Sequence, residues 1–211
     1  MRTIVAFDLG KVLVDFDYGI AARRIAARSR RSLEETQQLI EKSGYMVDYE
    51  SGRLTREEFF GHVREISGFD GTLVEFGELF ADIFTAMPGM IGLHAEVRRH
   101  GLPTYIFSNT NDLAVAHVRK NFPFFRDFDG YILSYQVKAM KPDPRIYEAL
   151  EKTSGRSGAE IVYIDDRPEN VAAGAARGWR VILHETPEKS RAAMKALGMV
   201  SPEPGVNLNS A

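Results

Sequence analysis

The chain has 211 residues, of which 44% are hydrophobic and 27% charged, a composition typical of one globular α/β core with room for a small second module. Its formal net charge of -2 gives no general attraction to nucleic acid or to an anionic membrane, and without cysteine the chain offers no disulfide, thiolate nucleophile or cysteine-based zinc site. No apolar run approaches the ~20 residues that span a bilayer and no signal-peptide pattern follows Met1, so we expect a cytoplasmic protein without nucleic-acid or membrane partners.

The first predicted element is a short apolar strand at residues 4–7, which ends at Asp8 and is soon followed by Gly10. In open α/β sheets, ligands bind outside the carboxyl ends of the parallel strands. Asp8 is therefore the first candidate for a functional site. Alternatively, a carboxylate in this place serves only to cap a turn.

Residues 17–87 carry helical signals and no convincing strand pattern. Capping-box sequences, in which a Ser or Thr is followed by Glu three places later, begin at Ser32, Thr55 and Thr72. The last two precede apolar residues at helical spacing. A cluster of arginines near the start of this segment is interpreted as a solvated helix face, because the net charge of the chain does not favour a nucleic-acid or phosphate patch.

These signals predict a helical-bundle cap at residues 17–87, inserted into an α/β core formed by residues 1–16 and 88–200. Residues 201–211 are rich in Pro, Gly and Asn and are expected to be a flexible tail.

From Pro88 onward, helix and strand patterns alternate. Such alternation predicts a Rossmann-like parallel sheet of five strands, flanked by helices and joined by right-handed crossovers. Strands are expected at residues 103–107, 131–134, 160–164 and 179–183, and helices at about 90–100, 112–121, 145–152, 169–177 and 187–197.

Because the carboxyl ends of parallel strands face one edge of a sheet, Asp8, Ser108 and the pair Asp165-Asp166 are expected to converge there. Adjacent acids repel one another and favour a bound cation. Mg²⁺ prefers oxygen ligands and typically binds one or two carboxylates together with water and phosphate. Asp8, Asp165, Asp166 and the backbone carbonyl of Gly10 are therefore candidate ligands of Mg²⁺.

The same groups suit phosphoryl transfer, which needs a nucleophile and positive charge on the phosphate. Asp8 is the candidate nucleophile. Ser108 can donate to phosphate oxygens, unless it is only a helix N-cap. Lys141, in a Pro-flanked loop, can bring positive charge to the phosphate. Asn109 and Gly10 are candidate substrate-binding residues, although Asn109 can equally serve only to shape its turn.

Four motifs, in this order along the chain, resemble those of the haloacid dehalogenase-like hydrolases: Asp8-Leu-Gly-Lys-Val12, Ser108-Asn-Thr110, Lys141-Pro-Asp-Pro144 and Tyr163-Ile-Asp-Asp-Arg-Pro-Glu-Asn170. The resemblance implies an aspartate nucleophile, a phosphate-binding hydroxyl, a lysine that steadies an aspartyl-phosphate and an acidic pair that holds magnesium. The helical insert resembles the cap of the subgroup that places it after the first motif. Within the family, the motifs look most like those of bacterial α-glucose-1-phosphate phosphatases.

The expected function is Mg²⁺-dependent hydrolysis of a small phosphorylated metabolite, such as a sugar phosphate, through an aspartyl-phosphate. A 2-haloacid dehalogenase-type hydrolase is one alternative, which the acidic pair argues against because that family lacks the metal site. A phosphomutase and a non-catalytic protein that binds a phosphorylated metabolite are the others. These patterns do not predict the oligomeric state.

The sequence departs from the family pattern at Gly10. The typical phosphatase has there a second Asp, which protonates the leaving alcohol and then activates water. General acid–base help of this kind is worth ~10²–10⁴ in rate. Three explanations stay open: Asp15, Asp17 or an acid of the cap replaces it, the substrate has a good leaving group such as an anomeric phosphate, or the protein is a weak or inactive phosphatase that binds a phosphorylated ligand. We favour the first two together.

Substrate specificity is expected to come from the cap, because the core supplies only generic phosphate handling. Tyr18, Tyr45, Asp48 and Tyr49 are candidate substrate contacts, although each can equally be a packing residue of the bundle.

Overall fold

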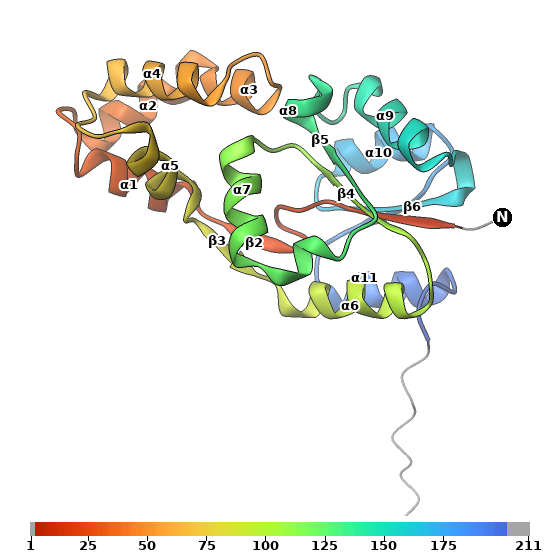
Figure 1. Ribbon diagram of the computed structural model, residues 1–211. Helices are drawn as coiled ribbons and strands as arrows, with labels where there is room; N and C mark the ends of the chain where they lie inside the picture. The colour runs from red at the N-terminus through yellow and green to blue at the C-terminus, as the bar shows by residue number, and fades with distance from the viewer. Residues whose placement is uncertain (1–2, 202–211) are drawn as a thin grey trace, which may run out of the picture.

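The computed structural model describes residues 3–201, without the side chains of residues 36 and 39–42. Its main sheet has five parallel strands in the order β5-β4-β1-β6-β7, with β1 at the centre (Figure 1). The strands are β1 (Ile4–Phe7), β4 (Thr104–Ser108), β5 (Gly130–Leu133), β6 (Ile161–Asp165) and β7 (Arg180–Leu183). The predicted fold class is therefore confirmed. Most of the tail predicted at residues 201–211 lies outside the described residues.

Helices cover both faces of this sheet (Figure 1). Residues of β1 are buried and alternate between the faces, as the pleat of a strand requires. Val5 and Phe7 pack on the side of three helices, and Ile4 and Ala6 pack on the side of two others. The first group is α6 (Pro88–Arg99), α7 (Asp112–Asn121) and α11 (Pro187–Ala196), and the second is α9 (Pro144–Ser154) and α10 (Pro168–Ala176).

Five further helices lie together at one end of the molecule, away from the main sheet (Figure 1). We call them the helical layer: α1 (Tyr18–Ala26), α2 (Leu33–Ser43), α3 (Tyr45–Glu50), α4 (Arg56–Ser67) and α5 (Leu73–Ala81). Phe59, Phe76 and Phe80 form the centre of its own aromatic core. All three predicted capping boxes are present, at the starts of α2, α4 and α5.

The prediction of no strand within residues 17–87 was wrong. Strand β3 (Phe84–Ala86) pairs antiparallel with β2 (Val14–Phe16), and this ribbon carries the chain into the helical layer and back. Three residues are too few for a visible alternation of polar and apolar side chains, and the pairing partner is far away in sequence. The division into core and cap between residues 16 and 17 and between residues 87 and 88 stays a prediction. Strand β2 ends just before the first of these boundaries, and β3 ends just before the second.

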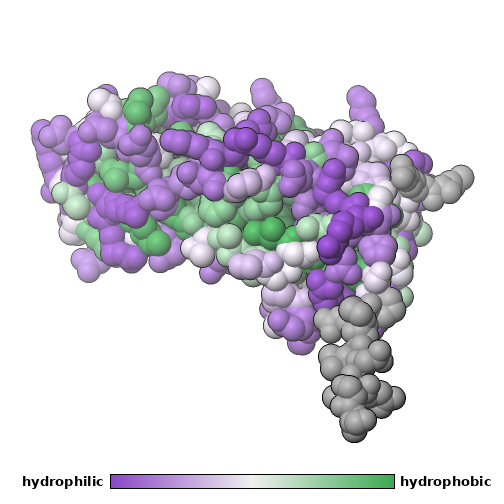
Figure 2. Space-filling view, turned by 60° about the horizontal axis from the view of Figure 1, so that its bottom comes forward, coloured by the Kyte–Doolittle hydropathy of each residue, from purple (hydrophilic) through white to green (hydrophobic). Residues whose placement is uncertain are grey.

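The other predicted elements occur within about two residues of their expected ends, and a short helix, α8 (Ser134–Val137), was not predicted. Between residues 3 and 201, no helix has the length and hydrophobicity needed to cross a membrane. Hydrophilic residues cover much of the helical layer in Figure 2, with hydrophobic groups between them. The exposed large hydrophobic residues of the described chain are Tyr18, Val47, Val74 and Leu183.

Candidate active site

The carboxyl ends of β1, β4 and β6 meet at one edge of the main sheet. Asp8 directly follows β1, Ser108 ends β4, and Asp165 ends β6. Carboxylate oxygens of Asp8, Asp165 and Asp166 all lie within 4.8 Å of one another. The structure thus brings together the acids that the strand pattern places at this edge, while their roles stay predictions.

Lys141 is buried between two of these acids. Its Nζ lies 3.0 Å from Asp8 Oδ1 and 2.6 Å from Asp165 Oδ2, and donates a hydrogen bond to the Phe107 carbonyl at 2.8 Å. The Asn109 side chain holds the loop in place: its Oδ1 accepts from the Lys141 backbone N–H at 2.7 Å, and its Nδ2 donates to the Lys141 carbonyl at 3.0 Å. Asn109 therefore positions Lys141, and it also lines the cavity described below.

Asp165 and Asp166 have different surroundings. Asp165 is fully buried and accepts hydrogen bonds from Lys141, the Tyr163 hydroxyl, the Asn170 side chain and the Arg167 backbone N–H. Its oxygens are thus already engaged by donors of the protein. Asp166 lines the cavity instead. Asp166 is therefore the better placed of the two to bind an ion beside Asp8, and Asp165 holds the lysine.

The charges at this edge do not balance. Burial raises the pKa of Asp8 to about 8 despite the opposing charge of Lys141. Burial, and then the charge of Asp165, raise the pKa of Asp166 above its ordinary value. Although burial acts in the opposite direction, the Lys141 charge holds the pKa of Asp165 below its ordinary value. The raised pKa values of Asp8 and Asp166 show that one ammonium does not fully offset the negative charge that these carboxyl groups carry when ionised, and this set of hard oxygen donors fits a divalent cation such as Mg²⁺.

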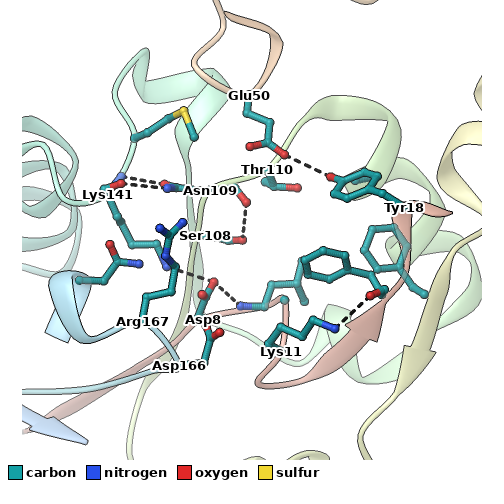
Figure 3. A pocket seen from close by; sticks show the side chains of 17 residues that line it. Asp8, Lys11, Tyr18, Glu50, Ser108, Asn109, Thr110, Lys141, Asp166 and Arg167 are labelled. Carbon is teal, nitrogen blue, oxygen red and sulfur yellow. Dashed lines mark hydrogen bonds and ion pairs between the residues drawn. The ribbon is translucent and has the colours of Figure 1, made fainter. Parts of the chain in front are cut away.

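A cavity of about 210 Å³ opens in front of these residues. It is smaller than the ~300–1,000 Å³ of typical ligand pockets, which favours a small ligand. The core and the helical layer both contribute to its wall (Figure 3). Its wall includes Asp8, Ser108, Lys141 and Asp166 from the core, and Tyr18 and Glu50 from the helical layer.

The Ser108 hydroxyl faces this cavity and is not used as a helix cap. Asn111 caps α7 instead, and its side chain accepts from the Ala114 backbone N–H at 2.9 Å. Ser108 is buried and makes a hydrogen bond of 3.3 Å to the carbonyl of Asn109. The alternative that Ser108 caps the helix was therefore wrong, and its hydroxyl stays a candidate phosphate donor.

Of the four candidate contacts of the cap, only Tyr18 lines this cavity. Tyr45 stacks on His62 with ring centres 4.1 Å apart, and Asp48 pairs with an arginine of the following loop. Tyr49 is buried against the phenylalanines of the helical layer. The sequence pattern did not single out Glu50, which lines the cavity, because nothing in the local sequence shows how the helical layer sits on the core. Arg167 also lines the cavity and was named only as a member of the fourth motif.

The local packing leaves little room for a side chain at position 10. A Cβ at Gly10 would lie 2.7 Å from the ring of Phe16, so a side chain there requires that ring to move. The two acids named as replacements do not line the cavity. Asp15 pairs with Lys11 at an exposed position, and Asp17 caps α1 by accepting from its first turn at 2.7 Å.

The helical layer is joined to the core beside the cavity. The Ser134 hydroxyl donates to the Glu50 carbonyl at 2.6 Å. Asp112, at the start of α7, accepts from the Tyr49 hydroxyl and from Arg56 Nε, the latter at 2.6 Å. These contacts fix the end of α3 over the cavity.

Comparison with known proteins agrees with this geometry. A family model described as haloacid dehalogenase-like hydrolase matches residues 3–178. The chain is similar to D-ribitol-5-phosphate phosphatase of Bacteroides thetaiotaomicron, with 23% identity over 192 residues, covering 86% of this chain and 91% of that protein. Its identity to hexitol phosphatase A of Escherichia coli is 29% over 103 residues, or 49% of this chain and 47% of that protein. A HAD family enzyme of Bacteroides thetaiotaomicron, solved with magnesium and inorganic phosphate, is similar with a TM-score of 0.75 and 25% identity, covering 88% of this chain and 95% of that one.

Proposed function

The chain belongs to the haloacid dehalogenase-like hydrolase family, and on that premise we propose that it is a Mg²⁺-dependent phosphatase acting on a small phosphate monoester through an aspartyl-phosphate at Asp8. The observation that carries the proposal is the meeting of Asp8, Lys141 and Asp166 at the wall of one small cavity. Relatives named as ribitol-phosphate and hexitol phosphatases support a phosphorylated sugar or polyol as the substrate class.

Different residues have different roles in the first chemical step. The Asp8 carboxylate attacks phosphorus while the bond to the leaving alcohol breaks. Lys141 orients Asp8 and offsets part of the negative charge, and the Ser108 hydroxyl donates to a phosphate oxygen. Asp8, Asp166 and the Gly10 carbonyl would hold the Mg²⁺ ion, with the Asp165 charge beside them. That ion would supply the positive charge that lets a carboxylate approach a phosphate dianion.

A phosphate-release assay over a panel of phosphorylated metabolites tests this proposal. The panel includes pentitol and hexitol phosphates and α-glucose 1-phosphate. We expect release of inorganic phosphate in Mg²⁺, loss of nearly all activity in excess chelator, and recovery when Mg²⁺ is added back.

Two results would contradict the proposal. Chelator-resistant release of halide from 2-haloacids would favour the dehalogenase. Tight binding of one metabolite with no turnover on the whole panel would favour the non-catalytic protein.

The Gly52→Ala variant tests whether the contact between the helical layer and the core matters for activity. Gly52 has a φ of +67°, and a Cβ there would lie 2.1 Å from the Tyr135 carbonyl oxygen of the core. The alanine should push α3 away from the cavity and lower kcat/KM by about 10²-fold, because small displacements of binding groups are costly in catalysis. Steady-state kinetics on the best substrate of the panel measures the effect.

Gly44→Ala is the matched control. Gly44 has a φ of +73°, but no heavy atom of the described residues lies within 4 Å of a Cβ placed there. This variant carries the same backbone strain without the collision and should keep its activity. Equal losses in the two variants would mean that strain within the helical layer, and not its contact with the core, is responsible.

A further inference from the structure

A phosphatase of this design lacks an obvious proton donor for its leaving group. An alkoxide is a poor leaving group, so an acid that protonates it as the bond breaks is worth ~10²–10⁴ in rate. Gly10 has no side chain, and Asp15 and Asp17 do not line the cavity. Protonation of the leaving oxygen therefore needs another acid that faces it.

The direction of the reaction identifies the relevant side of the cavity. In phosphoryl transfer the attacking and leaving oxygens lie roughly in line, on opposite sides of phosphorus. When Asp8 attacks, the leaving oxygen therefore points away from the main sheet. Figure 3 shows Glu50 and Tyr18 across the cavity from Asp8 and Asp166.

Glu50 is fixed in this position from both sides. It is the last residue of α3, and its backbone carbonyl accepts a hydrogen bond of 2.6 Å from the Ser134 hydroxyl of the core. Its carboxyl group accepts a hydrogen bond from the Tyr18 hydroxyl at 3.2 Å. Within the described part of the chain, Tyr18 is the only hydrogen-bond partner of that carboxyl group. One carboxyl oxygen therefore stays available to a group in the cavity.

We propose that Glu50 is the general acid for the leaving alcohol and the general base for the attacking water. This role rests on the proposed phosphatase function. In the first step, the bond from Asp8 to phosphorus forms, the bond to the leaving oxygen breaks, and that oxygen takes the proton of Glu50. In the second step, Glu50 takes a proton from water, the water oxygen bonds to phosphorus, and the bond between phosphorus and Asp8 breaks, with its electron pair returning to the Asp8 carboxylate. Inorganic phosphate leaves and Glu50 is protonated again.

The surroundings of Glu50 suit an acid that must hold a proton. Burial raises the pKa of Glu50 above its ordinary value, while the Tyr18 hydrogen bond and the positive charge of Arg167 act in the opposite direction. Tyr18 faces it from α1 and Arg167 faces it from the loop after β6. A raised pKa enlarges the protonated fraction near neutral pH, as general acid catalysis requires.

A leaving-group series tests the role with Glu50→Gln. Glutamine keeps the shape of the side chain and an acceptor for the Tyr18 hydroxyl, but it has no acidic proton to transfer to the leaving oxygen. The substrates are p-nitrophenyl phosphate, phenyl phosphate and simple alkyl phosphates, all assayed in Mg²⁺. We expect kcat of the variant to fall by ~10²–10⁴ on alkyl phosphates and by only a few-fold on p-nitrophenyl phosphate, whose leaving group needs no proton.

Glu57→Gln is the matched control, since Glu57 is an exposed acid of the same helical layer outside this cavity. It should match the wild type across the series, and thermal melts should show that both variants are folded. An equal loss on all leaving groups, or a change in KM alone, would overturn the role of Glu50 and leave the phosphatase standing. A wild-type protein inactive on the series and on the metabolite panel would overturn both.

Discussion

Replacing Asp8 with asparagine should lower phosphate release by about 10⁴-fold or more, as removal of a nucleophile does in other enzymes. Asparagine has the size of aspartate but cannot form the bond to phosphorus. The fold should survive, because Lys141 keeps its contact with Asp165 and the substitution relieves the crowding of three carboxyl groups. Phosphate release in saturating Mg²⁺ gives the activity, and thermal unfolding followed by circular dichroism gives the stability.

Asp15→Asn is the control for this experiment. Asp15 lies in the same segment of the chain, is exposed and does not line the cavity, so its substitution should change kcat by no more than a few-fold. Activity of Asp8→Asn at the wild-type level would remove Asp8 as the nucleophile. A large loss in Asp15→Asn with an intact fold would show that the turn after Asp8 takes part in the chemistry.

The sequence was sufficient for the main sheet because the signals of its elements are local. Each core strand is a short apolar run that ends next to a polar residue, and from β4 onward each strand is followed by a helix pattern. The rule that parallel strands share a carboxyl edge then brought Asp8, Ser108 and Asp165 together without any contact information. The position of Lys141 between two carboxylates did not follow from that rule, because it depends on a loop that Asn109 holds.

The part of the cavity wall that the helical layer supplies could not be predicted in the same way. Glu50 reaches it only because α3 is fixed on the core by contacts with Ser134 and Asp112, which are 84 and 63 positions away from their partners. The ribbon of β2 and β3 was missed for a similar reason. Its strands have three residues each and are recognised by their pairing, which is a long-range property. Elements that depend on docking or on distant pairing leave little trace in local patterns.

Lys141→Met should be the most destabilising of the proposed substitutions. Lys141 is 5% exposed and its ammonium contacts Asp8, Asp165 and the Phe107 carbonyl. Methionine fills a similar volume but leaves two buried carboxylates and a carbonyl without that partner. Removing one member of a buried ion pair typically costs ~3–5 kcal/mol of unfolding free energy. Urea unfolding measures the loss, and catalysis should fall with it because Asp8 is no longer held.

Lys138→Met controls for the loss of a positive charge from the same loop region. Lys138 is exposed, so the free energy of unfolding of this variant should lie within about 0.5 kcal/mol of the wild-type value. A Lys141→Met variant as stable as Lys138→Met would mean that the buried carboxylates do not need the ammonium.

The double variant Lys141→Met/Asp165→Asn separates the two tasks of the lysine. Asparagine removes one of the carboxylates that Lys141→Met leaves unpaired, so the double variant should recover part of the lost stability, with a coupling of ~0.5–3 kcal/mol. Activity should not recover with stability, because the proposed chemistry needs a positive charge beside Asp8. Added Mg²⁺ should also stabilise Lys141→Met more than it stabilises the wild type, since a cation bound by Asp8 and Asp166 replaces part of the missing charge. Recovery of full activity in the double variant would show that Lys141 only neutralises Asp165 and has no part in catalysis.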